Sequence, residues 1–183
     1  MKIRRLAVVV LLGTMLVTGV ACAPELMKPD VNYLPTGWYL DSEMECGCGE
    51  STMLSTGCFG ALLYRLGGRD WDNQVYVSIY YMEANEELKE LENDGEALSH
   101  LIIYDGTEEY SVEYGTMYID DRIAGFAKEC DPESGYYRMR VYCLKDSTFY
   151  KVLGVWNISR SDDEQDVTAV IESIIFGELE RCD

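Results

Sequence analysis

The densest group of side chains that can do chemistry lies in one short stretch. Cys46 and Cys48 flank a single glycine, Cys58 follows, and Met44 and Met53 lie beside them. Thiolates and thioethers are ligands of soft metal ions, so this stretch is a candidate site for Cu(I) or zinc. A C-x-C pair also suits thiol–disulfide exchange, because the ring closed between its sulfurs is strained and easily reduced. Both kinds of site require reduced thiols.

The number of cysteines favours a structural role instead. The chain has seven, and Cys22 ends an N-terminal apolar segment, where cleavage or lipid attachment takes it out of the pairing. An even set of six is typical of disulfide pairing in an oxidising compartment. The six candidates are Cys46, Cys48, Cys58, Cys130, Cys143 and Cys182. We expect up to three structural disulfides among them, with the connectivity left open.

Other reactive residues do not form a catalytic set. His100 is the only histidine, which excludes a site with two histidine ligands and disfavours histidine-based catalysis. Adjacent carboxylates at Glu108-Glu109, Asp120-Asp121 and Asp162-Asp163 are typical of solvated turns and helix starts. Asn157 begins an Asn-Ile-Ser sequon, a candidate glycosylation site in an exported chain. We expect no cofactor and a non-enzymatic protein.

The N-terminus predicts export. Lys2, Arg4 and Arg5 precede an uncharged apolar run over residues 6–20, and small residues follow it. This order is the layout of a secretory signal, and the run is shorter than the roughly 20 residues that span a bilayer as a helix. We therefore interpret residues 1–21 as a signal peptide.

Two cleavage sites remain open. The small residues before Cys22 resemble the lipobox of bacterial lipoproteins, in which a peptidase cuts before a cysteine that becomes lipid-modified. Gly19 stands where that pattern usually has leucine. The alternative is cleavage after Ala23, at an A-x-A site, which would release a soluble protein. We favour lipidation of Cys22 and hence attachment to the outer face of a membrane.

The charge of the exported chain restricts its partners. Outside the signal it has 12 basic and 33 acidic residues, a net charge of −21. Such a surface repels nucleic acid and anionic lipid headgroups. We therefore expect no nucleic-acid partner and membrane contact only through the lipid anchor. An unidentified protein or small molecule remains as the ligand.

Residue patterns predict a single α+β domain over residues 36–183, after a proline-rich tether over residues 22–35. Two helices are expected, one over 86–102 with Asn85 as its cap and Gly95 weakening or splitting it, and one over 163–176. Runs of β-branched and aromatic residues predict about six to seven mostly antiparallel strands. These are 38–44, 59–66, 74–82, 111–119, 122–129, 136–144 and 149–157.

Two parts of this pattern resemble PsbP-like domains. One is the opening Leu34-Pro35-Thr36-Gly37-Trp38, and the other is the late strand pair before a closing helix that ends Ile171-Glu172-Ser173-Ile174-Ile175-Phe176. The resemblance implies an α/β/α sandwich, with helices flanking an antiparallel sheet. That family includes extrinsic photosystem subunits and exported lipoproteins without known activity, and none of its functional residues carries over to this chain. Six cysteines are foreign to the family.

Two functional hypotheses follow from these observations. The first is a disulfide-stabilised, non-enzymatic module that binds a ligand or supports an envelope assembly. The alternative is an exported thiol–disulfide or metal-handling protein that uses Cys46, Cys48 and Cys58.

Overall fold

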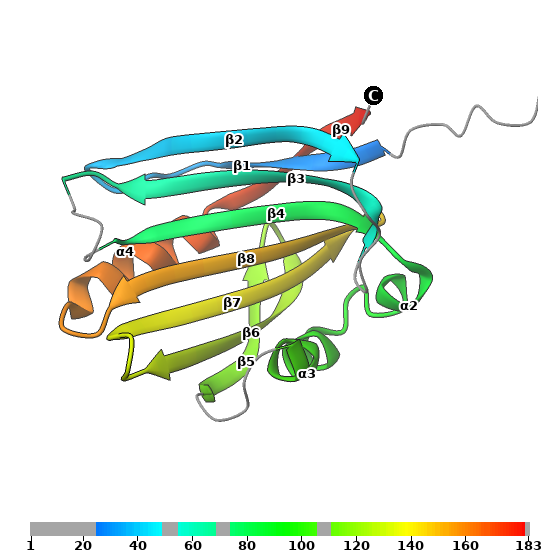
Figure 1. Ribbon diagram of the computed structural model, residues 1–183. Helices are drawn as coiled ribbons and strands as arrows, with labels where there is room; N and C mark the ends of the chain where they lie inside the picture. The colour runs from blue at the N-terminus through cyan, green and yellow to red at the C-terminus, as the bar shows by residue number, and fades with distance from the viewer. Residues whose placement is uncertain (1–24, 49–54, 69–73, 106–110, 182–183) are drawn as a thin grey trace, which may run out of the picture.

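The computed structural model describes residues 25–48, 55–68, 74–105 and 111–181. Seven strands form one antiparallel sheet in the order β2-β3-β4-β8-β7-β6-β5, which confirms the α+β class (Figure 1). The strands are β2 (Trp38–Cys48), β3 (Ser55–Leu66), β4 (Tyr76–Ala84), β5 (Ser111–Ile119), β6 (Arg122–Asp131), β7 (Tyr136–Lys145) and β8 (Thr148–Asn157). Each corresponds to one predicted strand, with ends shifted by a few residues.

Tight turns fix the register of the two predicted hairpins. Asp120 and Asp121 join β5 to β6, with φ of 46° and 61°, and Asp146 and Ser147 join β7 to β8, with φ of 48° and 69°. Two residues with positive φ form the turn whose twist matches that of antiparallel strands. Asp120 also accepts a hydrogen bond from the Phe176 amide at 3.1 Å, so its carboxylate has a structural role.

The first predicted helix is split, as the glycine within it suggested. The short α2 (Glu86–Lys89) is capped by Asn85, whose side chain accepts a hydrogen bond from the Leu88 amide at 2.8 Å. After a turn, α3 (Gly95–Asp105) begins at the glycine itself. His100 lies in the middle of α3.

The second predicted helix is shorter than expected. Helix α4 (Ser161–Glu172) ends before Ile174, where the chain enters strand β9 (Ile174–Arg181). The apolar residues at the end of the predicted helix also fit a strand, because β-branched and aromatic side chains favour extended backbone. Helix α4 starts without a side-chain cap hydrogen bond, and Glu164 near its start pairs with Lys128, at 2.5 Å.

The predicted tether over residues 22–35 is wrong from Glu25 onward. Residues Glu25–Val31 form strand β1, which pairs with β9 in a separate two-stranded sheet. Leu26 is fully buried, and the main chain of Met27 is held at both polar atoms: its amide donates to the Thr148 hydroxyl and its carbonyl accepts from the Tyr150 hydroxyl. Three prolines had suggested an extended linker, but Pro29 is compatible with a two-stranded sheet in which every strand has a free edge.

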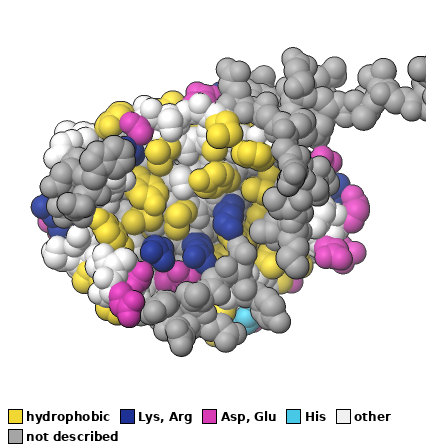
Figure 2. Space-filling model, viewed as in Figure 1, with side chains coloured by type: hydrophobic (Ala, Val, Ile, Leu, Met, Phe, Trp, Pro, Cys, Tyr) yellow, Lys and Arg dark blue, Asp and Glu magenta, His cyan; other side chains and the backbone are white. Residues whose placement is uncertain are grey.

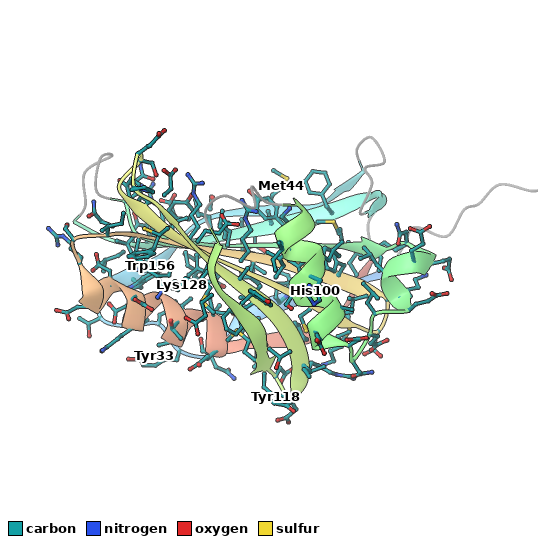
Figure 3. The ribbon with its side chains drawn as sticks, turned by 90° about the horizontal axis from the view of Figure 1, so that it is seen from below. Tyr33, Met44, His100, Tyr118, Lys128 and Trp156 are labelled. Atoms are coloured by element: carbon teal, nitrogen blue, oxygen red, sulfur yellow. The ribbon has the colours of Figure 1, made fainter. Side chains whose placement is uncertain are left out.

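Helices lie on both faces of the large sheet (Figure 3). On one face, α4 and β1 cover the main core, and on the other, α2 and α3 cover a smaller one. The main core includes Val77, Ile79, Val141, Val152, Val170 and Ile171. The smaller core includes Ala84, Leu88, Leu98, Ile102, Ala127 and Leu144. No helix among these described ranges is long and apolar enough to cross a membrane.

Two glycines allow the helices to approach the sheet. A Cβ at Gly125 would lie 2.2 Å from the amide nitrogen of Ser99, in the backbone of α3. A Cβ at Gly154 would lie 2.4 Å from a methyl carbon of Val167 in α4. Side chains at these positions would force the helices away from the strands.

We expect Gly125→Ala to destabilise the protein by about 1–3 kcal/mol, because helix backbone cannot move aside as a flexible side chain can. Gly115→Ala is the matched control, since its Cβ would meet only the ring edge of Phe126, at 3.3 Å. Urea denaturation followed by circular dichroism measures both changes. Equal midpoints for the two variants would contradict the close packing of α3 on β6.

Candidate functional site

Helix α3 covers only part of its face of the sheet. It contacts β6, β5 and β7, and α2 contacts the Ala84 end of β4, so within the described ranges these two helices leave most of the same side of β2, β3, β4 and β8 uncovered. We call this uncovered side, together with the start of β7, the open face. Figure 2 shows it towards the viewer, with Lys and Arg side chains among apolar ones.

Strand register brings distant residues into rows across the open face. In the first row, Tyr39 on β2 lies opposite Arg65 on β3, which lies opposite Tyr76 on β4. The row continues through Val155 on β8 to Arg138 on β7. Aromatic and cationic side chains therefore follow one another from strand to strand.

A parallel row runs four or five residues further along each strand. It joins Met44, Ala61, Tyr80, Lys151 and Tyr142. The ammonium group of Lys151 lies 5.4 Å from the centre of the Tyr142 ring, a distance typical of a cation–π contact. Met44 and Tyr80 are 52% and 41% exposed, so this row presents sulfur and aromatic surface to solvent.

A pocket of about 240 Å³ opens at the end of the first row. It is lined by Gln74, Tyr76, Tyr136, Arg138 and Val155. The lining combines two phenol rings, one amide and one guanidinium group, a set that binds both a flat apolar surface and an anion. Its volume lies below the roughly 300–1,000 Å³ of sites for drug-sized ligands, so it suits one ring or one side chain of a larger ligand.

Charges around the pocket are balanced locally. Burial raises the pKa of Tyr76 above its usual value, while the nearby Arg138 and Arg65 charges oppose this rise, so the phenol stays neutral and can donate. Arg138 lies 3.3 Å from Asp131. Hydrogen bonds from the hydroxyl and amide of Ser134, with the Arg138 charge, hold the pKa of Asp131 below its usual range. The Arg138 side chain remains 38% exposed.

The neighbouring Arg140 has a structural role. Its guanidinium lies 3.3 Å from Oε1 of Glu129, whose side chain is only 3% exposed. That oxygen makes no hydrogen bond with good geometry, so the Arg140 charge is its compensation. A buried carboxylate without a countercharge is strongly unfavourable. Arg140 therefore stabilises the sheet, and Arg138 is the better placed to contact a ligand.

Of the predicted cysteine candidates, two have described side chains. Cys130 is half-buried and Cys143 is fully buried, and both are free thiols. Burial raises the pKa of Cys143 to about 12, which keeps it a neutral, unreactive core residue. The side chains of Cys46, Cys48 and Cys58, together with residues Cys22, Met53 and Cys182, lie outside the described part of the structure.

The other candidates are not brought together. His100 is exposed, and its ring lies 6.0 Å from that of Tyr114. Asn157 accepts hydrogen bonds from the amide and hydroxyl of Ser159, at 2.9 and 2.7 Å, so the predicted sequon forms a local turn at the end of β8. No group of three metal-ligating His, Cys, Asp or Glu side chains occurs in the ranges that the structure describes.

Two further features on the α4 side have structural explanations. Lys128 lies between Glu164 and the rings of Tyr137 and Trp156, 5.1 and 5.6 Å from their centres, which holds α4 against the sheet (Figure 3). A hollow of about 490 Å³ is lined by residues of α4 alone, so no second element offers groups that converge on a ligand there.

We expect Arg140→Gln to lower the free energy of unfolding by about 3–5 kcal/mol, because it leaves Glu129 buried without its countercharge. Adding Glu129→Gln should restore more than half of the loss. Arg138→Gln is the matched control and should have a much smaller effect, since Asp131 keeps its hydrogen bonds from residues 133 and 134. Denaturant titration measures all three. An equal loss in the Arg138 and Arg140 variants would refute the separate roles.

No family model matches the chain, and no curated protein matches its sequence. A fold by itself does not specify what a protein binds, so function is inferred from the residues of the open face.

Proposed function

We propose that this protein is an exported, lipid-anchored and non-enzymatic binding module with a PsbP-like α/β/α architecture, and that the open face is its binding surface. Lipidation at Cys22 would hold it on the outer face of a membrane. The signal-like N-terminus supports export. Helices on both faces of an antiparallel sheet are compatible with the family resemblance.

The composition of the open face carries the proposal of binding. Tyrosine, methionine and arginine are enriched in protein binding surfaces, whereas unpaired acidic residues are depleted there. The open face contains Tyr39, Tyr76, Tyr80, Met44 and Arg138. This is unusual in a chain with 33 acidic residues, and the pocket at Arg138 gives the surface a defined centre.

The pairing of β2 with β3 argues against the alternative function, that of a thiol–disulfide or metal-handling protein. Cys48 and Cys58 are directly paired positions of β2 and β3. Directly opposed antiparallel residues have Cα atoms about 4.5–5.5 Å apart, a separation that a disulfide spans. This placement supports a structural Cys48–Cys58 disulfide over redox or metal chemistry, and it accords with the proposal of a disulfide-stabilised module.

Intact and peptide mass spectrometry of the natively exported protein tests the anchor and the disulfide. We expect an N-terminal Cys22 that carries a lipid mass, and a non-reduced peptide that links Cys48 to Cys58. Cys22→Ser should abolish the lipid mass. An unmodified chain that begins at Pro24 would refute the anchor. Free thiols at Cys46, Cys48 and Cys58, or a retained metal, would instead support the alternative function.

Hydroxyl-radical footprinting tests whether the open face is occupied in its native envelope. We expect oxidation of Tyr39 and Tyr80 to be several-fold lower in intact envelopes than in the purified protein, because a bound partner shields them. Tyr114 and Tyr118 are the controls, since both are exposed and lie on β5 at the far edge of the sheet. Equal labelling of Tyr39 and Tyr80 in both samples would refute occupancy of the open face.

A further inference from the structure

We infer that the open face binds an acidic polysaccharide of the uronic-acid type, with the polymer laid across the strands and one carboxylate held at Arg138. The inference rests on the proposed function and specifies its ligand class. It draws on the first row of residues and on the pocket at its end.

Arg138 supplies the anion contact. A guanidinium group has five N–H donors in a planar fork that matches a carboxylate. The 3.3 Å contact with Asp131 uses one nitrogen of that fork, and the exposed part of the side chain borders the pocket. Gln74 and the hydroxyls of Tyr76 and Tyr136 line the same pocket and can hydrogen-bond sugar hydroxyls.

Tyrosines supply surfaces for sugar rings. A phenol presents a flat apolar face and a polar hydroxyl, which matches a pyranose with its C–H faces and its rim of hydroxyl groups. Tyr39 is 45% exposed and Tyr80 is 41% exposed, so both rings are accessible from solvent. Tyr76, in the first row with Tyr39, lines the pocket together with Tyr136 and Arg138.

The spacing of the first row suits a repeating polymer. Neighbouring strands lie about 4.8 Å apart, a distance comparable with the length of one pyranose ring. A polysaccharide lying perpendicular to the strands would therefore meet Tyr39, Arg65, Tyr76 and Arg138 in turn. The ligand would contact side chains alone, because the backbone groups in the middle of a sheet are already paired.

That last point argues against an acidic peptide. Extended peptides bind by adding to the edge of a sheet, where unpaired backbone groups are available. The residues of the pocket instead belong to the interior strands β4, β8 and β7 and to Gln74 beside them.

Isothermal titration of the folded exported domain with polygalacturonate tests the inference. Fully methyl-esterified polygalacturonate, with the same backbone and no charge, and poly-glutamate are the comparison probes. We expect binding of polygalacturonate at least tenfold tighter than either. Arg138→Gln and Tyr39→Leu should each weaken it at least tenfold. The matched controls Arg160→Gln and Tyr118→Leu change the same residue types at exposed positions off the first row and should leave it unchanged.

Several results would overturn the inference. Equal binding of the esterified polymer would show that charge is not recognised, and equal binding of poly-glutamate would show attraction to any polyanion. Loss of affinity in the control variants would place the site elsewhere. Absence of binding to polygalacturonate would exclude this ligand class. Footprinting in native envelopes would still report whether the open face binds another ligand. A negative titration would therefore refute the polysaccharide ligand without refuting the open face as a binding surface.

Discussion

The contact between α3 and β6 determines which surface this protein presents. Because Gly125 lacks a side chain, α3 packs directly on the backbone of β6, at the β5 end of the sheet. A helix of eleven residues is about 16 Å long and cannot also reach the strands at the opposite edge. One half of this face is therefore buried against a helix. On the other half, apart from α2 at the Ala84 end of β4, no helix of the described ranges packs over the strands, and the side chains of the sheet face solvent.

The opposite face of the same sheet is covered by two elements, α4 and β1. There, α4 packs over Gly154, and β1 lies against the strands through the two hydrogen bonds at Met27. The main core forms on this side, and the stability of the domain is concentrated there. The side chains of the open face are consequently separated from that core by the sheet, which allows their substitution without loss of the fold.

The strands of the large sheet could be predicted from sequence because alternation and turn residues are local signals. β9 was missed because Ile174 and Phe176 also continue the apolar spacing of the preceding helix, and β1 because Pro24, Pro29 and Pro35 mask a short buried segment. The candidate site could not be predicted in the same way. Tyr39, Arg65, Tyr76 and Arg138 come together only through strand register, and individually each resembles an ordinary sheet residue.

Strand β1 also sets the distance between the domain and Cys22, the proposed site of lipid attachment. It begins at Glu25, so three peptide units separate it from Cys22, and their greatest extension is about 11 Å. A fourteen-residue linker over residues 22–35 would have allowed about 50 Å. With a lipid on Cys22, the domain would rest directly against the bilayer with little rotational freedom. Its range would be restricted to the first few nanometres of the envelope, and any polymer it captured would be drawn down to the membrane surface.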